Sequence, residues 1–225
     1  MEIKLLSKLS RDYVEQLLSG IPFFKLVKQQ DAWQFELLLQ SSRVVTYSPG
    51  EIVLQRGDSD HWLFFLLKGR LAVYADDPLK GELINYVTPG EVFGDLAQLM
   101  GQPRTATIIA EPNAKESMVL ATDASIFGDI NSSRPITVQT KLAYYRNTVH
   151  NLRWKLEVYR SQHLQHPLAN KHRQVRLYTG VKDTLEELKA LYEQAQTLAS
   201  LLLEWNSEFG ALNIESAKEQ NAYNV

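Results

Sequence analysis

The sequence contains no cysteine, and this absence excludes several kinds of site. Without thiols the chain has no disulfide framework, no thiolate zinc site and no cysteine nucleophile. Long apolar runs are absent as well, since no stretch approaches the roughly 18 residues that a transmembrane helix needs. Residues 1–18 carry charges throughout and have no continuous apolar core, so they do not resemble a signal peptide. We therefore expect a soluble, cytoplasmic protein.

Neither sign of charge dominates the sequence. The 24 Lys and Arg residues nearly balance the 26 Asp and Glu residues, which gives a formal charge of -2. This balance predicts no general attraction to nucleic acid or to an anionic membrane. The hydrophobic content of 44% is typical of a globular protein. A length of 225 residues allows one moderately large domain, or one domain with an extension.

The hydrophobic period changes twice along the chain. Residues 1–42 repeat apolar residues at three- and four-residue steps, which predicts helices. From residue 43 to 122 the period is two, and turn signals such as Ser-Pro-Gly and Lys-Gly separate short runs, as in an antiparallel barrel or jelly roll. The expected strands are 43–47, 51–55, 62–67, 70–74, 83–87, 105–110 and 117–121. Residues 135–225 have a helical period again.

The first part of this last zone contains a heptad pattern. Two sets of apolar residues recur every seven positions, namely Leu142, Val149 and Leu156, and Tyr145, Leu152 and Tyr159. Such a seam usually meets a partner helix, so it predicts a homodimer through residues 138–160, although the helix could instead lie against the barrel. A capping box at Asp183–Glu186 then predicts another amphipathic helix, followed by a frayed tail from Asn213.

Residues 93–110, FGDLAQLMGQPRTATIIA, contain an arginine that core packing does not require. Gly94 permits a close approach by a ligand, and the start of a short helix at Asp95 would present unpaired N–H groups. A guanidinium at Arg104 could hold a phosphate there, while Asp95 could accept a hydrogen bond from a sugar hydroxyl. This combination favours a small phosphorylated sugar as ligand. The alternatives are a permanent ion pair of Arg104 with Asp95 or Glu91, and a helix N-cap role for Asp95.

Two short segments here resemble a known cassette. Phe93-Gly94-Asp95-Leu96-Ala97 and Pro103-Arg104-Thr105-Ala106-Thr107 are similar to the phosphate-binding cassette of the cyclic nucleotide-binding domain family. This family includes bacterial catabolite-type regulators, kinase regulatory subunits and gated channels. The resemblance extends over about residues 15–160. It implies a mainly β fold with flanking α: an eight-stranded double-stranded β-helix jelly roll, an N-terminal helical bundle and long C-terminal helices.

The resemblance also implies roles for individual residues. Arg104 would hold the cyclic phosphate, Gly94 after Phe93 would let the ring pack closely, and Leu96 and Ala97 would offer backbone donors. Thr105 and Thr107 would contact phosphate or base, and the purine would be capped from the long helix, through Asn151 and Arg153. The ligand would be cAMP or cGMP, with no metal. The family usually has Glu where this chain has Asp95, which shortens the reach to the ribose by on the order of 1.5 Å.

Other chemistry has weaker support in the sequence. A metal-dependent barrel enzyme needs clustered histidines, and the β zone has only His61. His163 and His166 are spaced to share a metal on one helical face, but we expect solvated polar side chains near a helix end, because no carboxylate lies at a matching spacing. No nucleophile, base and acid fall at a catalytic spacing, so we do not expect an enzyme. The basic stretch 170–176 could touch phosphates, but no pair of short helices forms a helix-turn-helix motif.

The sequence thus predicts a jelly-roll unit over 1–134, a long hinge and dimerisation helix over 135–166, and a linker, amphipathic helix and tail over 167–225. Its predicted function is that of a non-enzymatic cyclic nucleotide sensor that signals through its C-terminal helices to a protein partner. One alternative is a degenerate dimeric scaffold that binds no nucleotide. Another is a transcription regulator with an atypical DNA-binding segment.

Overall fold

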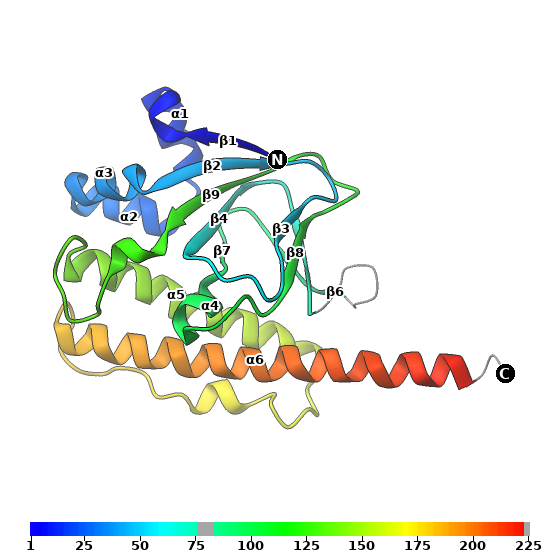
Figure 1. Cartoon of the computed structure of the whole chain (residues 1–225). Coiled ribbons are helices and arrows are strands. Elements are labelled where there is room, and N and C mark those ends of the chain that lie inside the picture. Colours follow the sequence, from blue (N-terminus) through cyan, green and yellow to red (C-terminus); the bar gives the residue numbers. More distant parts are fainter. Residues whose placement is uncertain (76–82, 223–225) are drawn as a thin grey trace.

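Two antiparallel sheets form the centre of the molecule (Figure 1). The computed structural model describes residues 1–75 and 83–222, with side chains described through residue 208. One sheet has the order β1-β2-β9-β4-β7 and the other has the order β3-β8-β5-β6. The strands are β1 Glu2–Leu5, β2 Ser42–Tyr47, β3 Ile52–Leu54, β4 Trp62–Lys68, β5 Leu71–Tyr74, β6 Leu83–Val87, β7 Val92–Phe93, β8 Thr107–Ala110 and β9 Ser117–Asp123.

The two sheets enclose a hydrophobic core between them. Leu66, Leu71, Ala110 and Val119 are among its fully buried members, and they come from four different strands. The jelly roll with flanking helices predicted from the sequence is therefore confirmed. All seven expected strands are present with bounds shifted by up to two residues. The short strand β7 was not predicted.

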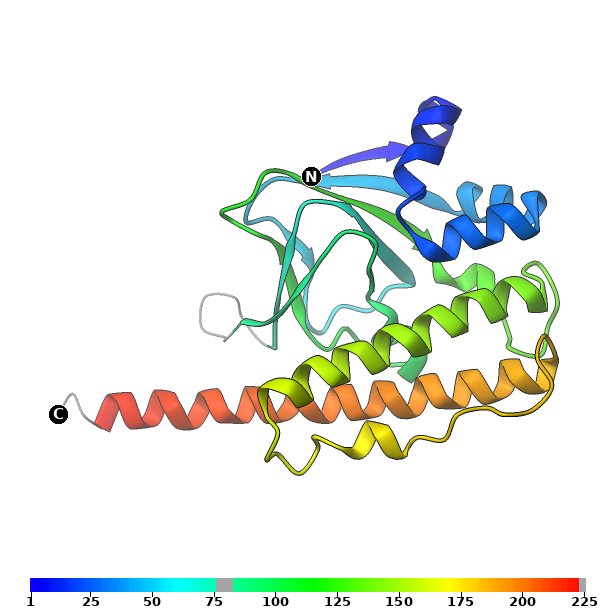
Figure 2. The ribbon, with the colours of Figure 1, turned by 180° about the vertical axis from the view of Figure 1, so that it is seen from behind.

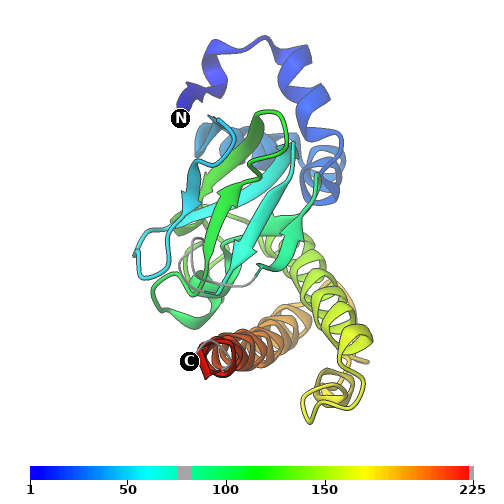
Figure 3. The same ribbon diagram turned by 90° about the vertical axis from the view of Figure 1, so that its right-hand side faces the viewer.

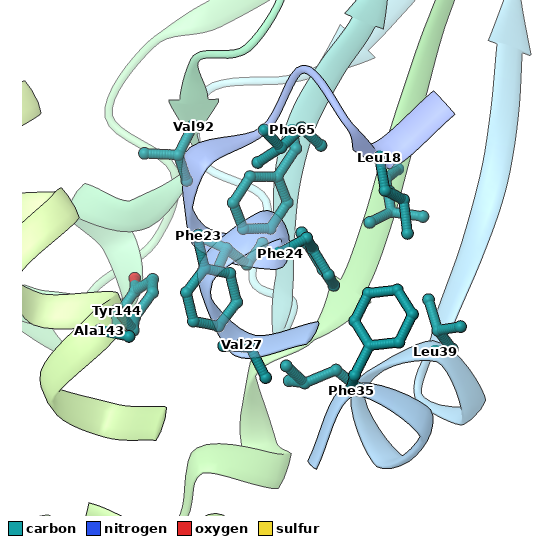
Figure 4. Packing of buried hydrophobic residues seen from close by; sticks show 14 of the residues in the cluster. Leu18, Phe23, Phe24, Val27, Phe35, Leu39, Phe65, Val92, Ala143 and Tyr144 are labelled. Atoms are coloured by element: carbon teal, nitrogen blue, oxygen red, sulfur yellow. The ribbon is translucent and has the colours of Figure 1, made fainter. Parts of the chain in front are cut away.

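Helices α1 (Arg11–Leu18), α2 (Pro22–Gln30) and α3 (Ala32–Gln40) cover one end of the five-stranded sheet. Phe23 and Phe24, at the start of α2, are buried and lie against Phe65 of β4, with ring centroids 6.1 and 5.1 Å away (Figure 4). Tyr144 reaches the same cluster from helix α5 (Val138–Gln162). The prediction that the first helix includes Leu5 is wrong. Residues 2–5 pair with β2 as an edge strand, and Leu6–Lys8 form a 3-10 turn.

Helix α5 (Val138–Gln162) and helix α6 (Leu185–Ala222) lie side by side (Figure 2). Five of the six heptad residues of α5 are buried and Tyr145 is half-buried, and the cluster that they form includes Leu188, Leu198, Ala199 and Trp205 of α6. The heptad face of α5, from which a second copy of the chain was predicted, is thus covered by α6 of the same chain. The evidence for a homodimer through residues 138–160 is removed, because the apolar face that required a partner has one.

The start of α6 corrects the predicted capping box by one residue. Thr184, not Asp183, caps the helix: its Oγ1 accepts a hydrogen bond from Glu187 N at 3.2 Å. Glu187 Oε2 in turn accepts from Asp183 N at 2.6 Å, so the carboxylate reaches the residue before the cap. At the other end, α6 continues to Ala222 and so includes most of the tail expected from Asn213. The last three residues of that expected tail lie outside the described residues.

Candidate functional site

A cavity that is partly open to solvent lies between the four-stranded sheet and the helices α4 (Asp95–Met100), α5 and α6. The sheet supplies an apolar wall that includes Leu54, Val73 and Ile108. The remaining lining residues are Asn85, Tyr86, Val87, Phe93, Gly94, Asp95, Leu96, Ala97, Arg104, Thr105, Ala106, Lys155, Tyr159, Leu202 and Asn206. An apolar cavity with a few convergent polar groups is the usual form of a small-molecule site.

Arg104 lies at this cavity and is only 3% exposed. Its Nη1 donates to Gly94 O at 2.6 Å, its Nη2 donates to Trp62 O at 2.5 Å and to Asp60 Oδ1, and its Nε donates to Asp60 Oδ2 at 3.1 Å. These bonds occupy four of the five guanidinium N–H groups and leave one on Nη1 within the described part of the chain. The alternative partners expected for this arginine, Asp95 and Glu91, are wrong, because its carboxylate partner is Asp60.

Asp60 precedes β4 and is held by the same network. Partial burial alone would raise the pKa of its carboxyl, but the hydrogen bonds from Arg104 and from Trp62 N outweigh it and lower the pKa below its ordinary value. The carboxylate therefore stays charged at neutral pH. Since its side chain is 30% exposed, Asp60 retains part of its hydration while it neutralises the guanidinium.

The turn before α4 brings the backbone close to Arg104. Gly94 has φ of +78°, a conformation that side chains rarely adopt, and a Cβ there would lie 2.8 Å from Arg104 Nη1. Gly94 is also the residue that precedes the first turn of α4, so Asp95 is not the N-cap that one alternative expected. Glycine at this position is what allows the carbonyl of the turn and the guanidinium to meet.

Asp95 is 1% exposed and lines the cavity. Its Oδ2 has no hydrogen-bond partner among the described residues. Burial raises the pKa of Tyr144 well above its ordinary value, and the negative charge of Asp95 adds to this effect. A buried carboxylate oxygen without a donor is costly, so this atom is suited to accept a hydrogen bond from a ligand hydroxyl.

Seven of the ten predicted binding residues lie at the cavity: Phe93, Gly94, Asp95, Leu96, Ala97, Arg104 and Thr105. Thr107 does not line it, and its Oγ1 instead accepts from Arg56 N at 3.2 Å. Asn151 and Arg153 do not reach it either. Arg153 donates to the carbonyls of His172 at 3.1 Å and Val175 at 2.9 Å. Helix α5 therefore lines the cavity with residues closer to its C-terminal end than the sequence predicted.

The helices contribute residues that sequence reasoning missed. Lys155 and Tyr159 line the cavity from α5, and Leu202 and Asn206 line it from α6. Each pair is four residues apart, so each occupies one face of its helix. Lys155 Nζ donates to Val92 O at 3.2 Å. Nothing in the local sequence distinguishes these residues from others on the same helices, because the packing of α6 decides which face meets the cavity.

The remaining polar clusters have partners within the chain. His166 lies against the ring of Trp205, with centroids 4.4 Å apart, and His163 lies 5.8 Å from the same ring. Within residues 1–75 and 83–208, no group of three side chains is placed to hold a metal ion. In the basic stretch, Lys171 pairs with Glu204 at 3.0 Å and Arg173 with Glu157 at 2.5 Å.

None of the helices in the described part of the chain combines the length and the apolar character that crossing a membrane would require.

Comparison with known proteins agrees with this geometry. Residues 44–131 match the family model of the cyclic nucleotide-binding domain. A cGMP-dependent protein kinase of Eimeria tenella is 29% identical over 104 residues, which are 45% of this chain and 10% of the kinase. The cAMP-dependent protein kinase type II regulatory subunit of Drosophila melanogaster is 27% identical over 100 residues, which are 44% of this chain and 26% of the subunit. The chain thus spans only a minor part of the length of these curated relatives.

Among solved structures, one described as Sp-2Cl-cAMPS bound to PKAR CBD2 is 26% identical, with a TM-score of 0.48. The match covers 66% of this chain and 90% of that one. The family match contains both halves of the cassette around Gly94 and Arg104 and most of the jelly roll. Residues 44–131 are therefore similar to the cyclic nucleotide-binding domain family, and the resemblance found in the sequence is confirmed over this segment.

Proposed function

We propose that this protein is a non-enzymatic sensor of cAMP or cGMP that signals to a protein partner through α5 and α6. The observation that carries the proposal is the convergence of Arg104 and the unpartnered Oδ2 of Asp95 on one cavity. A cyclic nucleotide offers that cavity a phosphate for the guanidinium and a ribose hydroxyl for the carboxylate. The apolar wall formed by the four-stranded sheet suits the rings.

The roles of the cassette residues follow from their positions. The remaining N–H of Arg104 Nη1 would donate to a phosphate oxygen, and the approach is open because Gly94 has no side chain. The backbone N–H groups of Leu96 and Ala97 and the hydroxyl of Thr105 would add hydrogen bonds. Asp60 would keep the guanidinium in place, and the positive charge of Arg104 would then interact with both the Asp60 carboxylate and the phosphate.

The signal would pass through the helices that line the cavity. Suppose that α5 and α6 can pack on the jelly roll in two arrangements. A ligand that touches both helices shifts the equilibrium between these arrangements only by the difference in its affinity for them. Coupling of about 1–3 kcal/mol is typical of such systems. The partner would then recognise one arrangement of the helix pair.

A second candidate function is a scaffold that binds no nucleotide. The ion pair between Arg104 and Asp60 favours it, because a guanidinium that already has a carboxylate partner does not need a phosphate. The shorter Asp95 in place of the family's usual Glu supports the same alternative.

Calorimetric titration with cAMP and cGMP distinguishes the two. The wild-type protein should bind at least one nucleotide, and Arg104→Ala should weaken binding by about 10- to 150-fold, since hydrogen bonds to a charged group are worth about 1.5–3 kcal/mol. Arg176→Ala, which removes an exposed arginine outside the cavity, is the matched control and should bind normally. Absence of binding by the wild type favours the scaffold. Equal binding by Arg104→Ala and the wild type assigns the site elsewhere.

A further inference from the structure

Helix α6 runs along one side of the jelly roll (Figure 3) and lies outside residues 44–131. It supplies one wall of the cavity. Leu198, Ala199, Leu202 and Trp205 bury one face of the helix in the cluster shared with α5. Gln196 Nε2 also donates to Leu99 O at 3.3 Å, which joins α6 to α4. The wall is therefore held in place by packing on two other helices. Any ligand in the cavity meets α6 as well as the cassette.

Two residues of α6 face the cavity, and they differ in chemistry. Leu202 is 4% exposed and offers an apolar surface. Asn206, one turn later, is half-buried and offers a primary amide with both donors and an acceptor. The hydroxyl of Tyr159 lies 3.5 Å from Asn206 Oδ1, a long contact that a better-placed donor could replace. The amide is thus positioned to read the edge of a planar ring.

We infer that Asn206 recognises the purine of the bound nucleotide and favours adenine. This inference rests on the proposed function. With the phosphate at Arg104 and the ribose at Asp95, the base extends toward the part of the cavity lined by α5 and α6. An amide pairs with the N6 donor and the N7 acceptor of adenine, whereas guanine offers two acceptors there and leaves the amide oxygen unpaired. Leu202 then packs against the ring.

This contact links the nucleotide to the seating of α6. The amide can reach the base only while α6 is packed on α4 and α5. Binding of the nucleotide and packing of α6 therefore stabilise each other. Hydrogen exchange should therefore slow in α6 when cAMP is added to the wild-type protein. The same change should be smaller in Asn206→Ala, because this variant loses the contact between α6 and the base. The long contact with the Tyr159 hydroxyl is lost as well, but it is present without nucleotide and so does not contribute to the change.

Titration of the full chain with cAMP, cGMP and the 7-deaza analogue of cAMP tests the inference. Asn206→Ala should lose about 5- to 150-fold in affinity for cAMP and clearly less for cGMP. Ser207→Ala, an exposed neighbour on α6 that does not line the cavity, is the control and should bind like the wild type. The 7-deaza analogue should bind the wild type more weakly than cAMP, and this difference should vanish in Asn206→Ala.

Each result separates this inference from the proposed function. If the wild type binds neither nucleotide, both are overturned. If the wild type binds cAMP but Asn206→Ala keeps the same ratio of affinities for cAMP and cGMP, only the role of Asn206 is overturned. The comparison of cAMP with its 7-deaza analogue needs no variant, and equal affinities for the wild type would also overturn that role.

Discussion

The guanidinium of Arg104 and the carboxylate of Asp60 form a two-point ion pair at the cavity, although 44 residues separate them in the chain. The pair joins the segment before β4 to the second half of the cassette. The arginine side chain is 2% exposed and that of the aspartate is 30% exposed, so the cation depends on its partner more than the anion does. An anion that enters the cavity would therefore meet an oriented guanidinium that is already partly neutralised.

Asp60→Asn should lower the free energy of unfolding by about 1–3 kcal/mol, because the buried guanidinium keeps its charge and loses a charged acceptor. Added cAMP should then raise the melting temperature of this variant more than that of the wild type, because the phosphate replaces the missing anion. Urea denaturation and thermal melts with and without nucleotide measure both effects. Asp58→Asn is the control, since it makes the same charge change at an exposed neighbour. Equal stability of Asp60→Asn and Asp58→Asn would contradict the role assigned to the pair.

Gly94→Ala should be more damaging than Gly101→Ala. Both glycines have positive φ, +78° and +60°, so each variant bears a backbone strain of about 1–2 kcal/mol. Only at Gly94 would the new Cβ also meet side chains, at 2.8 Å from Arg104 Nη1 and 3.2 Å from Phe64. The difference between the two variants therefore isolates the displacement of the guanidinium. We expect Gly94→Ala to be less stable in urea and to bind cAMP more weakly, while Gly101→Ala binds normally. Equal affinities would show that the contact with Arg104 does not matter.

The cassette could be predicted from the sequence because its information is local. Gly94 and Asp95 are adjacent, and Arg104 follows within one turn, helix and loop, so the motif itself specifies which residues meet. Asp60 could not be predicted in the same way. It is one of many carboxylates in the sequence, and only the pairing of β4 with its neighbours brings it to Arg104.

The heptad pattern of α5 shows a different limit. The spacing of Leu152 and Leu156 specifies that the helix has an apolar face, but it carries no information about whether the partner belongs to the same chain. The partner turned out to be α6, and its docking also decided that Lys155 and Tyr159, rather than Asn151 and Arg153, line the cavity. For the N-terminal residues 2–5, pairing with β2 outweighed the helical spacing of the leucines.

Leu198→Ala should destabilise the protein by about 2–5 kcal/mol, because Leu198 is fully buried between α5 and α6 and its loss leaves a cavity. Thr197→Ala, an exposed neighbour, should be close to neutral. If the helix pair is intramolecular, the urea midpoint of the wild type and of both variants should not depend on protein concentration. A midpoint that rises with concentration would instead indicate that this apolar face packs between two copies.

Glu157→Gln should flatten the acid limb of the stability curve. Glu157 lies on α5 and accepts hydrogen bonds from Arg173, His172 and Arg160, the first two of which belong to the segment between α5 and α6. The hydrogen bond from Arg173 is the main cause that lowers the pKa of Glu157 to about 2 from its ordinary 4.5. A carboxyl whose pKa is lower in the folded state stabilises the protein at pH values above its pKa in the unfolded state. This contribution is lost as the pH falls through its pKa in the folded state.

The free energy of unfolding of the wild type should therefore fall between pH 4.5 and about 2. Glu157→Gln should start lower at pH 7 and fall less over that window, whereas Glu186→Gln, at an exposed position in the first turn of α6, should follow the wild type. Parallel acid limbs for Glu157→Gln and the wild type would mean that this cluster does not tie the connecting segment to α5.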